Sequence, residues 1–457
     1  TLQGNTEAAA AAKAEMKALM RGAVHSYLEY AIDYASAGMY EEATQLLSFV
    51  AEGNEATYPM VYYALGYFAS KMGKKDEALN LYKKAETMCP DYCFPNKLEE
   101  VLMLNDAMSL NPEGAKAPYY LGNFHYAARI YDEAIACWEK SASIDDTYPT
   151  VLRNLSLAYY NKQHNPQKAL ATLEKAYNLD TTDARILMEL DQLYKKLRYP
   201  HRQRLDFLEA HADVVEQRDD LCIERITLYN QLGEYQKAYD LINSRKFHPW
   251  EGGEGKVTSQ YLLCRVELAK IAIREGRFAD AVRLLKETEK YPDNLGEGKL
   301  SMAEENDIHY WMGCAYEGLG EEALAKEYFT KATKGSAEPA IAFFYNDQQP
   351  DKIFYQGLAW RKLGEEDKAR SRFNRLIKHG EKHLFDKVKI DYFAVSLPDL
   401  LIWDDDLNVR NQIHCNLVMG MGYLGLGDKE QARKFLSEVA RLDINHQAGK
   451  QLLEMCG

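Results

Sequence analysis

The feature that most constrains the fold of this chain is a pair of small residues that recurs at fixed spacing. Seven of the glycines that stand five residues before an alanine mark a pattern that recurs along the chain. These pairs are Gly38 and Ala43, Gly73 and Ala78, Gly233 and Ala238, Gly276 and Ala281, Gly320 and Ala325, Gly364 and Ala369, and Gly427 and Ala432. A second glycine stands twelve residues before the alanine at Gly66, Gly122, Gly313, Gly357 and Gly420. Small residues allow two helices to approach closely, and a glycine can take the left-handed conformation that ends a helix. The spacing therefore predicts repeated antiparallel helix pairs.

The clearest copy of the pattern occupies residues 306–332. Gly313 and Ala325 are small enough for close helix contact, and Gly320 lies at the predicted turn between them. Phe329 and Ala332 lie on one face of the second helix, because three residues is close to one helical turn. This order of residues resembles the tetratricopeptide repeat, whose period is ~34 residues. The resemblance implies an all-α fold, a right-handed α-α superhelix (TPR-like solenoid) of about ten helix pairs.

Repeat spacing divides the chain into three regions. Residues 1–24 are rich in alanine and favour a leading helix or a linker. Residues 25–245 carry regular repeats, with an additional helix expected within 91–112. The repeat at 184–215 lacks the small-residue markers, so we expect its helix pair to be longer or packed differently. In 246–457 each repeat exceeds the usual period and carries an insert.

Four inserts account for the longer repeats, and each follows the second helix of its pair. They cover 244–256, 291–303, 334–350 and 380–408. Insertions at one phase of a solenoid emerge along one edge, so we expect the four to form a continuous ledge. The ledge is rich in large apolar residues, which normally mark an interface. These residues are Phe247, Trp250, Phe343, Phe344, Phe393, Leu400, Leu401 and Trp403.

A second resemblance rests on five longer motifs. They read FHPWEGGEGKV, YPDNLGEGKL, ENDIHYWMGCAY, FFYNDQQPDKIFYQGLA and DYFAVSLPDLLIWDDDLN. They resemble the C-terminal region of large bacterial proteins that carry a domain named DUF5107, closely over 206–457 and only in general before it. The resemblance implies β-rich domains ahead of the repeats, similar to sugar-processing β-sandwich enzymes. The activity of that family is unknown, so the resemblance implies no particular reaction.

The first two inserts contain candidate sugar-binding residues. An aromatic face beside carboxylates is common in sugar sites, and the first insert offers His248, Trp250, Glu251 and Glu254. Glu297 of the second insert is positioned to pair with Glu254, and two carboxylates ~5–10 Å apart permit acid–base chemistry. The alternative is structural: Trp250 plugs its loop onto the solenoid, and the two glutamates cap the next helices.

The third and fourth inserts contain further polar candidates. Tyr345, Asn346 and Asp347 form either a binding loop or a turn closed by side-chain hydrogen bonds. Asp404 and Asp405 begin a run of three aspartates after an apolar segment. Such a run is usually solvated or caps the next helix, and binding a cation would require further oxygen ligands around it.

Composition and motifs exclude several functional classes. The net charge of −13 argues against a nucleic-acid partner. No apolar run approaches the ~20 residues that a membrane-spanning helix requires. The eight cysteines lack zinc-site spacing and a disulfide framework, which favours free thiols in a reducing, cytoplasmic compartment. The sequence contains no phosphate loop, dinucleotide fingerprint or nucleophile elbow, so it predicts neither a cofactor nor a catalytic residue.

Two functions are consistent with these observations. The first is a non-catalytic scaffold that binds a protein partner, most directly a β-rich N-terminal half of the same protein. The alternative is that the edge inserts complete or regulate the active site of a carbohydrate-active enzyme. The two are distinguished by whether the polar insert residues converge on a pocket or point into solvent.

Overall fold

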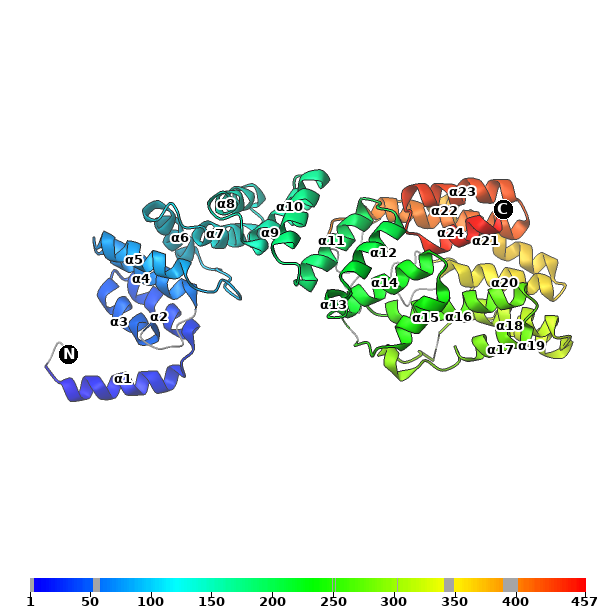
Figure 1. Cartoon of the computed structure of the whole chain (residues 1–457), viewed down its shortest axis with the longest axis horizontal. Helices are drawn as coiled ribbons and strands as arrows, with labels where there is room; N and C mark the ends of the chain where they lie inside the picture. The colour runs from blue at the N-terminus through cyan, green and yellow to red at the C-terminus, as the bar shows by residue number, and fades with distance from the viewer. Residues whose placement is uncertain are drawn as a thin grey trace. The chain divides into compact units, whose positions relative to one another are not determined.

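The computed structural model describes residues 4–51, 58–248, 250, 252–301, 303–340, 349–388 and 402–457. Within these ranges the regular secondary structure is entirely helical, as predicted for an all-α solenoid. The chain forms two compact units, Thr1–Thr181 and Thr182–Gly457, whose helices are labelled in Figure 1. We describe each unit separately.

Unit 1 is built from antiparallel helix pairs with one extra helix. Its helices are α1 (Thr6–Met20), α2 (Val24–Ser36), α3 (Tyr40–Ala51), α4 (Pro59–Lys71), α5 (Lys75–Glu86), α6 (Leu98–Leu110), α7 (Lys116–Ala127), α8 (Tyr131–Ile144), α9 (Pro149–Asn161) and α10 (Pro166–Leu179). The extra helix predicted between residues 91 and 112 is α6. It is held to the preceding pair by Asp106, which accepts hydrogen bonds from Ser70 (3.1 Å) and Tyr82 (2.5 Å).

Unit 2 continues with longer and less regular pairs. Its helices are α11 (Ala184–Lys196), α12 (His201–Ala210), α13 (Ala212–Val215), α14 (Asp219–Gln231), α15 (Tyr235–Asn243), α16 (Lys256–Arg274), α17 (Phe278–Lys286), η1 (Asp293–Leu295), α18 (Asn306–Gly318), α19 (Glu322–Ala332), α20 (Pro350–Lys362), α21 (Glu366–His383), α22 (Leu407–Leu426), α23 (Lys429–Leu442) and α24 (Gln447–Met455). In the repeat without markers, the second helix stops at Ala210 and a single turn, α13, follows it. That pair is therefore packed differently, not lengthened.

The predicted turn glycines adopt the left-handed conformation. All seven glycines that precede the marker alanine have φ between 75° and 83°. Where the glycine is missing, another residue takes the same conformation at the turn between the paired helices: Arg129 (φ 64°), His164 (φ 51°) and Arg198 (φ 63°). The repeat phase thus persists through pairs whose sequence has lost the marker.

The second set of glycines explains how closely the paired helices pack. A Cβ atom on Gly313 would lie 2.6 Å from the ring of Phe329, which real contacts essentially never show. In every case the obstructing side chain belongs to the residue four positions after the alanine that follows the glycine by twelve residues, such as Ala134 after Gly122. The other pairs are Gly66 with Tyr82 (2.4 Å), Gly122 with Trp138 (2.4 Å), Gly357 with Phe373 (2.4 Å) and Gly420 with Leu436 (2.6 Å). These contacts confirm the prediction that small residues bring the two helices together.

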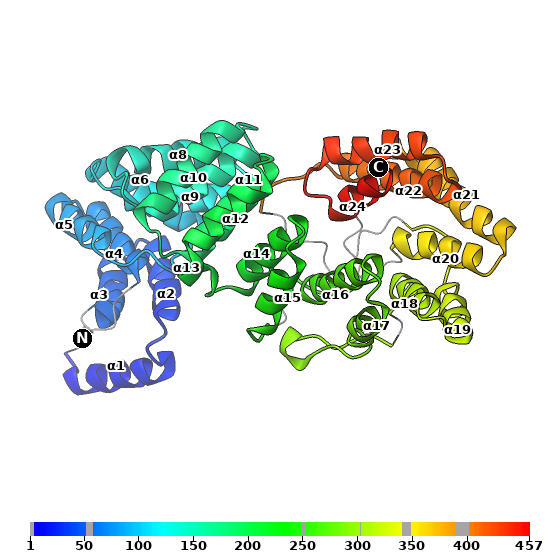
Figure 2. The same ribbon diagram turned by 45° about the vertical axis from the view of Figure 1, so that its right-hand side comes forward.

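The two ends of unit 2 contact each other through a polar interface that we call the clasp. It joins α11, α12 and α14 to residues 440–450 around the α23–α24 turn. Asn445 lies at its centre: its Oδ1 is 3.2 Å from His201 Nε2 and 3.3 Å from Arg204 Nη1. Gln231 Nε2 donates to the Asn445 carbonyl at 2.8 Å, and Lys450 Nζ donates to the Gln231 carbonyl at 2.7 Å. Figure 2 shows α24 beside α22 and α23, which position this turn.

A buried ion-pair network lies directly behind the clasp. The side chain of Arg204 is fully buried and donates to Asp191 at 3.0 and 2.6 Å and to Glu224 at 2.7 Å. Lys195 donates to the same Glu224 carboxylate at 2.9 Å. Burial raises the pKa of Asp191, whereas Lys195 and Arg204 outweigh burial and lower the pKa of Glu224. The network is costly to bury and stays in place because each charge has a partner.

Candidate functional site

The first two inserts lie side by side, as the ledge prediction requires. The backbone N–H of Phe247 donates to the Asn294 carbonyl at 2.8 Å. Asn294 Nδ2 in turn donates to the carbonyls of Ile242 and Arg245, both at 2.9 Å. Phe247 is buried, so this phenylalanine anchors the first insert, a role that one of the two interpretations of the sequence gave to Trp250.

Glu297 caps the helix that follows the first insert. Its carboxylate oxygens accept the Gly255 N–H at 3.1 and 3.0 Å, and Gly255 is the N-cap residue of α16. Burial raises the pKa of Glu297, and the nearby charge of Glu254 acts in the same direction. Of the two roles considered for Glu297, this geometry favours capping, because the carboxylate is occupied by backbone of its own chain.

The other candidates of the first insert are held locally. The His248 N–H donates to Asp219 Oδ2 at 2.8 Å, and its exposed imidazole has Nδ1 3.3 Å from the same oxygen. The indole of Trp250 lies against Gly253, where a Cβ would fall 2.0 Å from the ring. Glu251 lies outside the described residues.

The remaining candidates fall partly outside the described structure. Tyr345, Asn346 and Asp347 belong to 341–348, which the structure does not describe. Asp405 pairs with Lys196 at 3.0 Å and with Arg410 at 3.3 Å.

Asp405 and its neighbours place the end of the fourth insert against α11. Asp406 caps α22 by accepting the Asn408 N–H at 2.8 Å, one of the roles expected of the aspartate run that includes Asp404. The buried Trp403 donates its indole N–H to the Glu189 carbonyl at 3.1 Å. Because 389–401 are not described, the continuous four-insert ledge stays a prediction.

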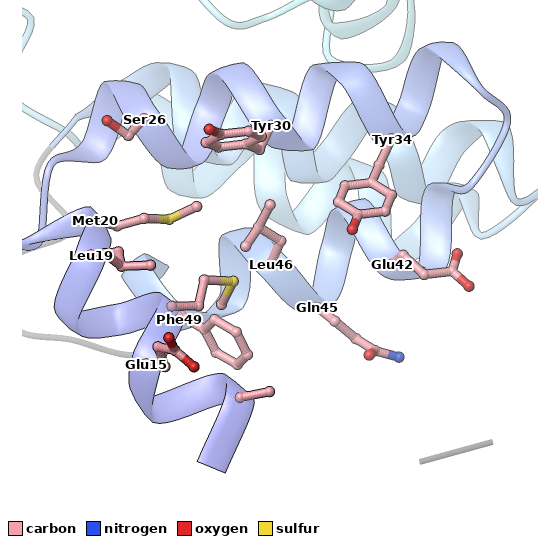
Figure 3. Close-up of a pocket in the computed structure, with 12 residues that line it drawn as sticks. Glu15, Leu19, Met20, Ser26, Tyr30, Tyr34, Glu42, Gln45, Leu46 and Phe49 are labelled. Carbon is pink, nitrogen blue, oxygen red and sulfur yellow. The ribbon is translucent and has the colours of Figure 1, made fainter. Parts of the chain in front are cut away.

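A groove in unit 1 was not anticipated from the sequence. It lies between α1 and the α2–α3 pair, has a volume of about 720 Å³, and is called here the α1 groove. Its lining is mostly apolar: Ala12, Glu15, Met16, Leu19, Met20, Ser26, Tyr30, Tyr34, Glu42, Gln45, Leu46 and Phe49. Figure 3 shows Tyr30 and Tyr34 on α2 facing the side of the groove where Leu46 and Phe49 lie.

The helix over this groove covers it only loosely. None of the residues of α1, all of them described, is buried. The ammonium groups of Lys13 and Lys17 lie 4.0 and 5.1 Å from the centre of the Phe49 ring. Leu19, although apolar, is largely exposed. The groove is therefore an apolar surface that the chain itself leaves accessible.

Comparison with the next repeat explains why the groove exists. Tyr30 and Tyr34 precede Leu65 and Ala69 by 35 residues, the spacing between the marker alanines of the two pairs. Tyr30 is 54% exposed and Tyr34 42%, whereas Leu65 is 5% exposed and Ala69 2%. In the later pair these positions lie on a helix that contacts α3 of the preceding pair. The α1 groove is thus a stacking face that lacks its helix.

A second, smaller cavity lies in unit 2. It has a volume of about 350 Å³ and is bordered by the start of α20, by α22 and by the α23–α24 turn. Its polar lining includes Asp351, Arg410, His414, Asp443 and His446. Burial lowers the pKa of His414 to about 4, and the charges of His379 and His446 act in the same direction.

Three further observations concern the cysteines, metal sites and membrane-spanning segments considered in the sequence analysis. The eight cysteines, each within the described residues, are unpaired. Among the described residues no cluster of three or more His, Cys, Asp or Glu side chains has the geometry to hold a metal ion. None of the described helices combines the length and apolar character needed to cross a membrane.

Comparison with known proteins identifies tetratricopeptide repeats in the chain. Two models of this repeat match, one at residues 61–92 and 307–334 and the other at 353–379. Similar solved structures include YrrB, a TPR protein with an unusual peptide-binding site, at 17% identity over 48% of this chain and 95% of that chain, with a TM-score of 0.28. PilF of Pseudomonas aeruginosa is 19% identical over 49% and 90%, with a TM-score of 0.29. The Naa15/Naa10 complex bound to HypK-THB is 10% identical over 94% and 65%, with a TM-score of 0.34.

Proposed function

We propose that this chain is a protein-binding scaffold and that the α1 groove is a docking site on it. The observation that carries the proposal is the contrast between Tyr30 and Leu65, which occupy equivalent positions in consecutive repeats. A repeat array stacks apolar faces on one another, so a face without its neighbour exposes surface that the fold is built to bury. Tetratricopeptide repeats generally mediate interactions between proteins, which agrees with this reading.

The sequence resemblance adds a finer proposal about the partner. A β-rich N-terminal half of the same protein is one candidate for docking on the repeats. The carbohydrate alternative stays a prediction about the insert edge. It requires polar insert residues to converge on a ligand, and Glu297 and Asp405 are already bound to groups within the chain.

The proposal is tested by comparing what the chain and a groove variant capture. We would immobilise the wild-type chain, a Tyr30→Asp, Phe49→Asp variant, and a control with the exposed aromatic Tyr92 changed to Asp. Proteins retained from a lysate of the source organism would be quantified by mass spectrometry. We expect a set of proteins that the groove variant loses and the control keeps. If every retained protein binds all three forms equally, the proposal is wrong.

A further inference from the structure

We infer that the occupant of the α1 groove is an amphipathic α-helix of a partner protein with Lys or Arg beside its apolar face. This inference rests on the proposed function, because it names the chemistry of the partner at the same site. It draws on three independent properties of the groove: its shape, the charge of its walls, and the contacts that lysines already make there.

The shape of the groove fits a helix. In the later pairs, the second helix of one pair contacts the first helix of the next, as α3 contacts α4 and α8 contacts α9. The α1 groove is the same face of the first pair, so the geometry of the repeat fits a helix of similar length. The helices α2 and α3 contain 13 and 12 residues, so the matching segment spans about three turns, or ~18 Å.

The apolar floor sets the pattern that the occupant must carry. Tyr30, Tyr34, Leu46 and Phe49 line the groove along the direction of the α2–α3 pair. A helix contacts such a strip through residues at i, i+3, i+4 and i+7, which share one face. The occupant therefore has large apolar residues at this spacing. Within α1 only Met16, Leu19 and Met20 at its C-terminal end have this spacing, and none of the α1 side chains is buried.

The charge of the walls selects a basic occupant. Residues 24–51, which form the α2–α3 pair, contain four carboxylates and neither lysine nor arginine. They are Glu29, Asp33, Glu41 and Glu42. Glu42 lines the groove directly, and Glu15 of α1 lines its opposite side. An apolar strip between carboxylates favours a helix that carries cations beside its apolar face, because opposite charges steer and orient a partner.

Lysines already occupy the edges of this surface. Lys13 and Lys17 of α1 lie over the ring of Phe49, which lines the groove. These contacts show that both elements of a basic amphipathic helix, the alkyl stem and the ammonium group, have partners here. A lysine-bearing partner helix would repeat contacts that the chain makes with itself.

The test measures binding of defined helical peptides by fluorescence anisotropy. The probes are two labelled, stapled peptides of about four turns with the same apolar face, one flanked by lysine and one by glutamate. We expect the full chain to bind the basic peptide at least about tenfold more tightly than the acidic one, with an affinity that falls as salt rises. Equal affinity for the two peptides would overturn the inference.

Two charge reversals separate a specific groove from general attraction to an acidic protein. Glu42→Lys removes a carboxylate from the groove, and Glu133→Lys makes the same change on the exposed surface of α8. We expect Glu42→Lys to weaken the basic peptide at least about fivefold and Glu133→Lys to leave its affinity nearly unchanged. If both substitutions weaken binding equally, the attraction is non-specific and the inference fails.

The remaining outcomes distinguish this inference from the proposed function. If the Tyr30→Asp, Phe49→Asp variant loses partners from the lysate but the basic peptide is not preferred, the scaffold proposal stands and the inference is wrong. A doubled mass in light scattering that Tyr30→Asp abolishes would assign the groove to a second copy of this chain and would also overturn it. If the lysate experiment and the peptide measurement both fail, both proposals are wrong.

Discussion

The two units of this chain end their helical arrays in opposite ways. In unit 2 the first and last repeats meet, and the clasp around Asn445 joins them by hydrogen bonds. In unit 1 the first pair ends in an apolar face that α1 covers without burying any of its own described residues. Every repeat array has end faces that its internal contacts do not cover. The comparison shows that one chain can close one array on itself and leave an apolar end face of another accessible.

The chemistry of the two ends differs as much as their geometry. The clasp is polar and is supported by the buried Arg204, whose charge is matched by Asp191 and Glu224. The ion pairs join α11, α12 and α14 on one side of the clasp, and Arg204 also donates across it to Asn445 Oδ1 at 3.3 Å. The α1 groove is lined by apolar groups with carboxylates at its sides. Apolar contact tolerates many side chains, which suits a surface that accepts another protein.

The largest effect should come from removing the charge behind the clasp. Arg204→Ala leaves Asp191 buried without its cation and leaves Glu224 with Lys195 alone, and breaking a buried pair in this way typically costs about 3–5 kcal/mol. We expect the free energy of unfolding of unit 2 to fall by this amount while unit 1 is unchanged. Urea denaturation combined with hydrogen exchange resolved by peptide would measure the two units separately. As a control, Arg202→Ala removes an exposed arginine that bonds Glu234 and should leave the free energy of unfolding nearly unchanged.

A second effect tests the close helix contact in both units. Leucine at Gly66 in unit 1 or at Gly313 in unit 2 would overlap the ring of Tyr82 or Phe329. We expect each substitution to cost about 1–3 kcal/mol or more, because overpacked cores must shift side chains and backbone. Thermal melting measures the loss. Gly298→Ala, at a position with open space around its Cβ, is the control and should leave the melting temperature nearly unchanged.

Acid should destabilise unit 2 through His414. Its pKa is about 4 in the folded chain against an ordinary value of 6.5, so the unfolded chain binds the proton first. The stability that the neutral histidine contributes is present above pH 6.5 and is lost as the pH falls from 6.5 towards 4, by about 1 kcal/mol per pH unit. Denaturation measured across this range should show the loss. A His414→Gln variant should show a flatter profile, and an unchanged slope would contradict the assignment.

The smallest effect concerns the two glutamates of the inserts. Changing Glu254 and Glu297 to Gln should alter the free energy of unfolding by within about 1 kcal/mol, as expected for partly exposed sites. The Gly255 N–H can still donate to the amide oxygen that the Glu297→Gln substitution introduces. Calorimetric titration of monosaccharides into wild type and variant would test the carbohydrate alternative at the same time. If the wild-type chain binds a sugar and the variant does not, the result would support the carbohydrate alternative for the insert edge.

The repeat architecture was predictable because its signal is periodic. Gly320 at the turn and Gly313 against Phe329 follow from short-range rules, and the same spacing recurs throughout the chain. The anchor of the first insert was not predictable. Phe247 and Trp250 are both large aromatics, and which one turns inward depends on the backbone path that Asn294 fixes from the next insert.

The sequence contains even weaker signals of the clasp and of the α1 groove. Arg198 donates to the Arg441 carbonyl at 2.6 Å across 243 residues of chain, a separation with no periodic pattern to reveal it. The groove exists because no helix packs tightly on this face, so its trace in the sequence is Tyr30 and Tyr34 where the next repeat has Leu65 and Ala69. A comparison of equivalent positions between first and later repeats would have found it.

The clasp also has a kinetic consequence. In an open array each pair contacts only its neighbours, so structure can nucleate in several places and spread. A bond such as that between Arg198 and Arg441 has very high contact order, and it forms only after the intervening helices have brought its ends together. We therefore expect closure of the clasp to be a late step in the assembly of unit 2. Once closed, unit 2 is held together at both of its ends, so we expect it to unfold more cooperatively than an open array would.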